Sequence, residues 1–294
     1  MDKKPIIAVV VNASGGKASR EGEGLRAKLV KAFAGHGVVV EPQLVEGADI
    51  PAALTAASSA DVVAVGGGDG TQGSAAALLS KAGKTMAVLP LGTLNHLALD
   101  LGIPDDLGEA AAIAVNGAER QIDLAEAGDQ IFVNNASVGI YTRLVRVRDA
   151  QPLPKWLATF PAAWTVLKGL KLRRLEIEIN GSRRTIETPL LFIGNNPYNL
   201  TGRRLGKRDT LDTGMLGLNA VRHKNLAALI GFALRALVGR ADPARDFVDI
   251  EDCAEFVLHG SGPIDVAHDG EVSRMQLPLR FRSLPGALRV KVPA

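Results

Sequence analysis

Residues 61–71, with the sequence DVVAVGGGDGT, carry the strongest structural signal in this chain. Residues 61–65 read as a short, almost continuously apolar strand, which is typical of a strand buried on both faces of a parallel sheet. Glycines follow the strand directly, and a helical segment follows the glycines. A strand that runs through a glycine turn into a helix is typical of an α/β domain, whose sites lie at the carboxyl ends of its strands.

The same alternation extends on both sides of this segment. Apolar runs predict strands at residues 6–11, from residues 38–40 and at residues 85–89. Helices are predicted at residues 19–34 and 51–59, and on both sides of the strand at 85–89. This order predicts a doubly wound α/β domain in the N-terminal half.

A different pattern begins after Asp123. Residues 175–179 alternate apolar and charged side chains, and Asn180-Gly181 separates them from a second short strand at 184–187. Asn-Gly adopts the positive φ angles of a type I′ turn, so this is a hairpin signal. Further short strands are predicted at residues 189–194, 216–221, 256–258 and 264–267. The second half is therefore predicted to be mainly antiparallel β, with a basic helix at about residues 154–172 inserted in it.

Length and composition set the broad class. A chain of 294 residues favours two domains: an α/β nucleotide-binding domain at 1–124, with residues 285–294 packing back on it, and a β-rich substrate domain at 125–284. The hydrophobic share of 47% excludes a disordered or fibrous chain. The single cysteine, Cys253, excludes an internal disulfide and a cysteine-based zinc site. With no signal-peptide core or apolar membrane span, we expect a cytoplasmic protein, at most peripheral to the inner face of the membrane.

The positive charge is concentrated in one region. The net charge is +3, but residues 141–208 contain 14 Lys and Arg against 4 Asp and Glu. This region could attract an anionic membrane surface, and the predicted basic helix interleaves Trp156, Phe160 and Trp164 with lysines. A solvated face is the alternative of equal weight. Nucleic acid is the poorer partner, because no binding motif is present and aromatic residues make up 4% of the chain.

The glycine turn at residues 66–71 suits a phosphate ligand. Glycines let the backbone approach an anion, the helix that follows presents free N–H groups, and the Thr71 hydroxyl could cap the helix and touch phosphate. A tight turn that binds nothing is the alternative. Residues 68–73 also match the dinucleotide fingerprint GxGxxG, but weakly, because they do not follow the first strand and no acidic residue lies about 20 positions on.

A second small-residue turn follows the next strand, at residues 89–95. Neighbouring parallel strands would place Thr93 and Asn95 beside the first turn. The loop at residues 12–17 could complete a phosphate site, with Lys17 as a phosphate contact.

Three motifs together resemble the diacylglycerol kinase catalytic-domain family, and most closely its bacterial soluble lipid kinases, which are relatives of sphingosine kinases. They are Gly67-Gly68-Asp69-Gly70-Thr71, then Pro90-Leu91-Gly92-Thr93-x-Asn95, and Asp269-Gly270-Glu271. The resemblance runs from Asn12 to Glu271. NAD kinases and phosphofructokinases share the first motif. The resemblance therefore also implies an N-terminal domain similar to theirs.

The resemblance implies an ATP- and Mg²⁺-dependent kinase that phosphorylates a hydroxyl of a diacylglycerol- or sphingoid-type lipid. Glu271 corresponds to the family's general base, Asp123 to an important aspartate at the domain crossover, and Asp69 is placed to organise Mg²⁺. A structural Mg²⁺ site is expected at Asp212 and Met215. Twelve residues are expected to hold ATP, two of them, Asn12 and Lys17, in the first loop. The other ten are Gly67, Gly68, Asp69, Gly70, Thr71, Gln72, Gly73, Gly92, Thr93 and Asn95.

Two departures from the family pattern leave alternatives open. His96 stands where an aspartate is usual, and Thr213 separates Asp212 from the glycine that should follow it. A non-catalytic protein that binds a nucleotide or phospholipid is therefore one alternative. A kinase for a soluble acceptor such as NAD is the other, although the chain lacks the Asn-Glu pair of NAD kinases. The acceptor and the oligomeric state, with a homodimer among the options, stay open.

Overall fold

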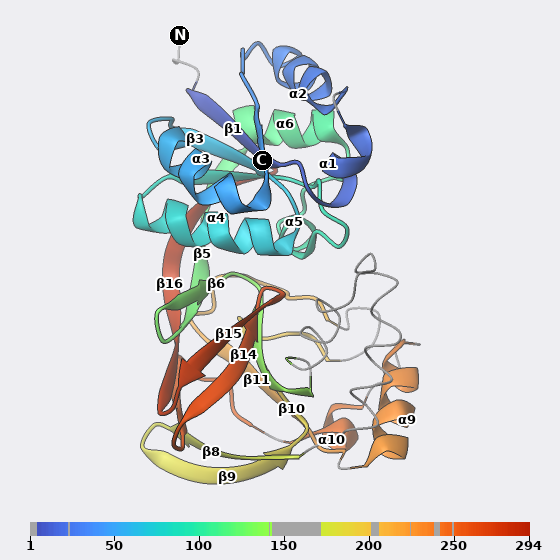
Figure 1. Cartoon of the computed structure of the whole chain (residues 1–294), viewed down its shortest axis with the longest axis vertical. Coiled ribbons are helices and arrows are strands. Elements are labelled where there is room, and N and C mark those ends of the chain that lie inside the picture. The colour runs from blue at the N-terminus through green and yellow to red at the C-terminus, as the bar shows by residue number, and fades with distance from the viewer. Residues whose placement is uncertain are drawn as a thin grey trace. The chain divides into compact units, whose positions relative to one another are not determined.

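The chain forms two compact units, shown in Figure 1. Unit 1 comprises Met1–Leu124, Ile131–Asn134 and Leu284–Ala294, and unit 2 comprises Ala125–Gln130 and Asn135–Ser283. The computed structural model describes residues 5–22, 24–140, 142, 172–200, 206–223, 225–237, 242–248 and 250–294. The basic helix predicted near residues 154–172 falls outside these described residues.

Unit 1 contains a parallel sheet with the strand order β2-β1-β3-β4-β16. The strands are β1 (Ile7–Asn12), β2 (Gln43–Val45), β3 (Val62–Gly66), β4 (Thr85–Leu89) and the last part of β16 (Leu279–Val292). The helices are α1 (Gly16–Glu21), α2 (Gly24–Ala34), η1 (Gly47–Asp49), α3 (Ile50–Ala57), α4 (Asp69–Lys81), α5 (His96–Asp100) and α6 (Leu107–Asn116). Helix α2 packs against α6, and α3 packs against α4 (Figure 1). The predicted doubly wound α/β fold is confirmed.

The apolar runs of the sequence form the centre of unit 1. All residues of β3 and β4 are buried, as expected for strands covered on both faces. Strand β5 (Ala118–Ala127) pairs with β16 and with β6 (Gln130–Phe132). The carboxyl ends of β1, β3 and β4 therefore lie side by side, and the loops that follow them meet there.

Two details of the α/β prediction are wrong. The single helix expected at residues 19–34 is two helices, because Gly22 adopts a φ of 56° between α1 and α2, a conformation that ends a helix. The strand expected from residues 38–40 starts later, as β2. Pro42 has no N–H for a sheet ladder, and pairing with β1 begins at the next residue, Gln43.

Unit 2 is mainly antiparallel, which confirms the predicted second half. One sheet has the order β12-β11-β10-β7-β14-β15, and β13, β8 and β9 extend a second ladder from the first part of β16. The strands are β7 (Asn135–Gly139), β8 (Arg173–Ile179), β9 (Ser182–Thr188), β10 (Leu190–Asn195), β11 (Leu216–Val221), β12 (Phe247–Val248), β13 (Glu255–His259), β14 (Pro263–His268) and β15 (Glu271–Gln276). The described helices of this unit are α9 (Leu226–Leu237) and α10 (Pro243–Asp246).

Two hairpins of unit 2 share the same turn chemistry. Asn180 and Gly181 adopt φ angles of 50° and 76° between β8 and β9, as the Asn-Gly signal predicts. Asp269 and Gly270 adopt φ angles of 44° and 88° between β14 and β15. The Asp-Gly-Glu motif therefore forms a tight turn followed by the first residue of β15.

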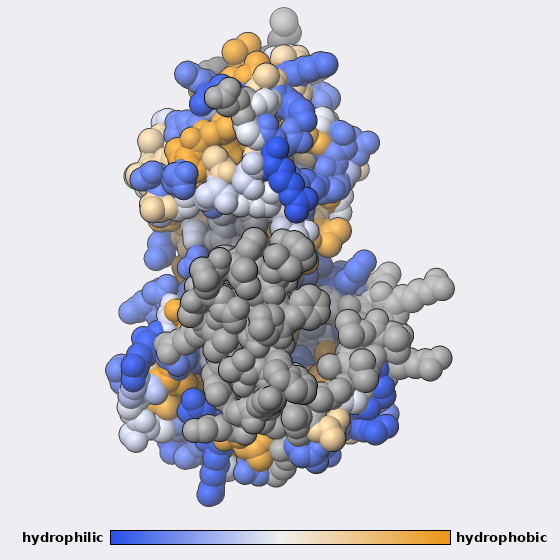
Figure 2. Space-filling view, turned by 45° about the vertical axis from the view of Figure 1, so that its right-hand side comes forward, coloured by the Kyte–Doolittle hydropathy of each residue, from blue (hydrophilic) through white to orange (hydrophobic). Residues whose placement is uncertain are grey.

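Hydrophilic areas alternate with smaller hydrophobic ones on the described surface in Figure 2. Among the described residues the exposed large apolar side chains are Ile6, Val30, Val39, Leu94 and Leu99. None of the described helices combines the length and the apolar character that a membrane-spanning helix needs.

Candidate functional site

Three loops of unit 1 pack closely where the parallel strands end. A Cβ atom on Gly92 would lie 2.6 Å from the Gly68 Cα atom, and one on Gly67 would lie 2.7 Å from the Thr71 Cβ atom. A Cβ atom on Gly16 would lie 2.4 Å from the Leu91 carbonyl oxygen. Real Cβ atoms do not approach other atoms this closely. Glycine at these positions is therefore what lets the loops touch.

Hydrogen bonds join the same loops. The Asn12 side-chain amide donates to the Thr71 hydroxyl at 3.0 Å, which links the end of β1 to the first turn of α4. The His96 N–H donates to the Asp69 carboxylate at 3.0 Å, which links α4 to the start of α5. The Lys17 N–H donates to the Leu91 carbonyl at 2.8 Å. The structure thus brings together the predicted residues of all three loops.

Some predicted ligands have a structural contact in this arrangement. The Lys17 ammonium pairs with the exposed Asp105 carboxylate. Gln72 is buried and donates to the Val65 carbonyl at 3.0 Å, inside its own loop. Thr71 does not cap α4, because the N-cap residue is Gly68, and Thr71 lies in the first turn with its hydroxyl against Asn12.

Two features leave this edge of the sheet suited to an anion. The N-cap residue of α4 is Gly68, and no side chain of the described residues caps the helix, so its first N–H groups stay available to a ligand at the positive end of the helix dipole. A Cβ atom on Gly68 would meet nothing within 4 Å, so there is open space beside the backbone. Asn95 adopts a φ of 54°, and its buried side-chain oxygen has no hydrogen-bond partner among the described residues. As an acceptor, this oxygen suits a hydroxyl or a bound water rather than a phosphate oxygen.

Asp123 lies on β5 and is 1% exposed. Its carboxylate accepts a hydrogen bond of 2.9 Å from the Gly286 N–H of β16. The described contact therefore connects Asp123 to the crossover strands of unit 1.

Glu271 belongs to unit 2. It is exposed and is the Cα partner of His268 across the β14–β15 hairpin. Asp269 holds the turn against β7, because its N–H donates to the Asn135 carbonyl at 3.0 Å and its carboxylate accepts from the Asn135 N–H at 3.3 Å. The motif thus presents Glu271 to solvent from a braced turn.

The predicted metal loop lies between β10 and β11. The Asp212 carboxylate accepts from the Thr210 hydroxyl, and the Asn196 side chain accepts from both the N–H and the hydroxyl of Thr213, at 2.8 and 2.6 Å. The Met215 carbonyl accepts from the Asn196 N–H. The described residues contain no group of three His, Cys, Asp or Glu side chains that could hold a metal. One carboxylate with backbone oxygens suits Mg²⁺, which keeps several of its waters.

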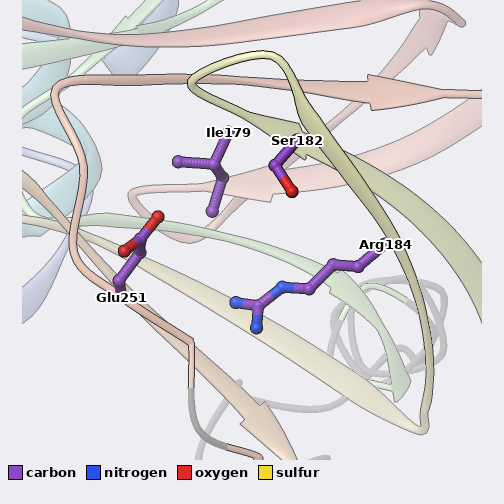
Figure 3. Close-up of a pocket in the computed structure, with 4 residues that line it drawn as sticks. All are labelled: Ile179, Ser182, Arg184 and Glu251. Carbon is purple, nitrogen blue, oxygen red and sulfur yellow. The ribbon is translucent and has the colours of Figure 1, made fainter.

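A separate pocket of about 270 Å³ lies at the end of the β8–β9 hairpin in unit 2. Figure 3 shows its lining residues, with the charged ends of Arg184 and Glu251 directed into it beside Ile179 and Ser182. None of these four residues was predicted from the sequence to belong to a functional site. Nearby, burial and the charges of Asp252 and Glu251 raise the pKa of the Cys253 thiol to about 11, so this cysteine is not a thiolate nucleophile.

Sequence reasoning missed several polar residues of these sites. Ser14 donates to the Asn12 side chain, Asn196 anchors the metal loop with a φ of 71°, and His268 pairs with Ser273. Asn12-x-Ser14 is a local turn signal that could have been read. The contact of Asn196 with Thr213 joins residues 17 positions apart, and that of His268 with Ser273 depends on the register of the β14–β15 hairpin.

Comparisons with known proteins agree with this architecture. Residues 6–127 match the diacylglycerol kinase catalytic domain, and residues 134–292 match the YegS C-terminal NAD kinase beta sandwich-like domain. A protein of Chromohalobacter salexigens named "Probable lipid kinase YegS-like" is 31% identical over 88% of this chain and 85% of its own length. A diacylglycerol kinase of Bacillus subtilis is 31% identical over 79% of this chain and 78% of its own.

A solved structure supports the fold. The crystal structure of a diacylglycerol kinase from Bacillus anthracis superposes with a TM-score of 0.71 and 19% identity, over 99% of this chain and 98% of that one. The family resemblance carried by the three sequence motifs is therefore confirmed. The chain is a kinase and belongs to the lipid kinase family whose members join a diacylglycerol kinase catalytic domain to a YegS-type C-terminal domain.

Proposed function

We propose that this kinase transfers the γ-phosphoryl group of ATP, with Mg²⁺, to a hydroxyl of a diacylglycerol- or sphingoid-type lipid. The observation that carries the proposal is the closely packed set of three loops, with an uncapped α4 N-terminus and open space at Gly68. This arrangement suits phosphate groups. The names of the relatives, a probable lipid kinase and a diacylglycerol kinase, support a lipid acceptor.

The chain's own residues divide the chemistry between the two units. In unit 1, the loop N–H groups orient the phosphates, and Asp69 keeps the loops after β3 and β4 together. The buried Asn95 side-chain oxygen accepts from a hydroxyl or a bound water of the nucleotide. In unit 2, Glu271 accepts the proton of the lipid hydroxyl as that oxygen bonds to the γ-phosphorus and the bond to ADP breaks. The proton stays on Glu271, and ADP leaves as the anion.

Mg²⁺ supplies charge neutralisation on the phosphates and, at the second site, a brace for a loop. Asp69 has one carboxylate oxygen on the His96 N–H and would offer the other to a metal-bound water. Asp212, with the carbonyl of Met215, would hold the structural ion. Peripheral contact with anionic lipid through the basic region at residues 141–208 is part of the same proposal.

The direct test is transfer of labelled γ-phosphate from ATP to diacylglycerol and a sphingoid base in mixed micelles, with and without Mg²⁺. We expect a labelled lipid phosphate that needs Mg²⁺. Label on NAD instead would establish the soluble-acceptor alternative. ATP binding without transfer to any acceptor would favour a non-catalytic relative.

A pair of glycine variants tests where the phosphate lies. Gly68→Ala places its methyl group in open space, so we expect the free energy of unfolding to change by no more than about 1 kcal/mol while ATP binding weakens. Gly92→Ala forces two loops apart, so we expect it to lower the free energy of unfolding by about 1–3 kcal/mol. Urea unfolding and ATP titration calorimetry measure both. Unchanged ATP affinity in Gly68→Ala would show that the ATP phosphates do not lie at the N-terminus of α4.

A further inference from the structure

A second ionisable side chain lies beside Glu271 in the β14–β15 hairpin. His268 is the last residue of β14 and Glu271 is the first residue of β15, and the two are direct partners across the ladder. Side chains of directly opposite residues project from the same face of an antiparallel pair and contact one another there. Ser273 lies on that face too, and its hydroxyl is 2.8 Å from the His268 Nε2 atom.

The two partners differ in their exposure to solvent. His268 is 9% exposed, whereas Glu271 is exposed. Burial lowers the pKa of His268 below its usual value, and the negative charge of Glu271 acts on it in the opposite direction. At neutral pH the imidazole is therefore uncharged, and the hydrogen bond with Ser273 fixes its ring.

No other charge of the hairpin shares this face. Asp265 and Arg274 are partners of each other, and by the alternation of the strands they project from the opposite face. The strand on the other side, β7, contains no ionisable residue. Asp269, in the turn, directs its carboxylate to the Asn135 N–H. Within the described part of the chain, Glu271 is thus the charged group of the hairpin that shares a face with His268.

We propose that His268 is a positioning residue for Glu271. When the His268 imidazole is uncharged, Glu271 is free to accept the substrate proton. When the imidazole is protonated, its positive charge makes Glu271 a poorer proton acceptor. The inference rests on the proposed role of Glu271 in phosphoryl transfer. Its consequence is that acid inactivates the kinase by charging a histidine rather than by protonating the carboxylate alone. Nothing in the Asp-Gly-Glu motif itself would produce this behaviour.

The interaction between the pair is measured first without any reaction. NMR follows the titration of the His268 imidazole, assigned among the 5 histidines by its disappearance in His268→Gln. In Glu271→Gln we expect its midpoint to move to lower pH by about 0.5, because the carboxylate that favours the charged ring is gone. Glu251→Gln, an exposed glutamate of the same unit, is the matched control and should leave the midpoint unchanged. An unchanged midpoint in Glu271→Gln would overturn the inference.

The pH profile of lipid phosphorylation then tests the consequence. We expect kcat/KM of the unmodified enzyme to fall by about tenfold more than that of His268→Gln as the pH drops through the measured His268 midpoint. Above pH 7.5 the ratio of the two kcat/KM values should no longer change with pH, since glutamine and neutral histidine are both uncharged. The same acid limb in both enzymes would overturn the proposal. If the unmodified enzyme phosphorylates no lipid, the proposed function fails, and the NMR titration still decides whether the pair interacts.

Discussion

Glu271→Gln is expected to lower kcat for lipid phosphorylation by about 10²–10⁴-fold, the usual contribution of a positioned general base. Glutamine has nearly the same shape but cannot take a proton from the lipid hydroxyl. Glu271 is exposed at the start of β15, and its turn is held by Asp269 rather than by its own side chain. The substitution should therefore leave folding and ATP affinity unchanged. Initial rates in mixed micelles at saturating ATP measure the loss.

Glu251→Gln serves as the matched control, because it removes an exposed carboxylate from the same unit and should keep full activity. If Glu271→Gln retains activity within about threefold of the unmodified enzyme, Glu271 is not the base. A loss of activity accompanied by a lower melting temperature would instead indicate a structural role for the turn.

Local patterns predicted most of the fold because they act over a few residues. The buried run at 61–65 became β3, and Asn180-Gly181 formed the turn that its positive φ angles allow. Where the prediction failed, a single residue outweighed the pattern. Gly22 divided one expected helix into α1 and α2, and Pro42 delayed pairing of β2. Hydrophobic periodicity predicts neither the helix break at Gly22 nor the later start of strand pairing after Pro42.

The site was less accessible to prediction, because its geometry depends on contacts across loops. Adjacent parallel strands were enough to place Thr71 and Asn95 on neighbouring loops. They did not reveal that the Asp69 carboxylate accepts the His96 N–H. That bond also gives His96 a use that the family pattern does not suggest, since it acts through its backbone. Likewise, the pairing of His268 with Glu271 follows from strand register, which a single motif cannot specify.

Asp246, at the end of α10, is a buried carboxylate with several hydrogen-bond donors around it. It is 0% exposed and accepts hydrogen bonds from His223 at 2.8 Å, from the Asp242 N–H at 2.8 Å and from Arg235 of α9. Burial alone would raise the pKa of Asp246, but these hydrogen bonds outweigh burial and hold the pKa below its usual value. The carboxylate thereby joins the end of β11 to α9 and α10.

Asp246→Ala is expected to lower the free energy of unfolding by about 3–5 kcal/mol, because it leaves the Arg235 guanidinium and His223 without their buried partner. Asp246→Asn keeps a hydrogen-bond acceptor of similar shape and should cost less. Asp129→Ala removes an exposed aspartate from the same unit and should stay within about 0.5 kcal/mol of the unmodified protein. Urea unfolding at pH 7 compares the three variants.

The pH dependence separates the charge of Asp246 from its packing. A carboxyl group whose pKa is lowered by folding stabilises the protein fully above its unfolded pKa of about 3.9, and this contribution is lost as the pH falls through the lower folded value. The difference in free energy of unfolding between the unmodified protein and Asp246→Ala should therefore be present at pH 5 and shrink below about pH 4. A difference that keeps its full size down to pH 3 would show that Asp246 stabilises unit 2 by packing alone. A difference below about 1 kcal/mol at pH 7 would contradict the buried ion pair as a source of stability.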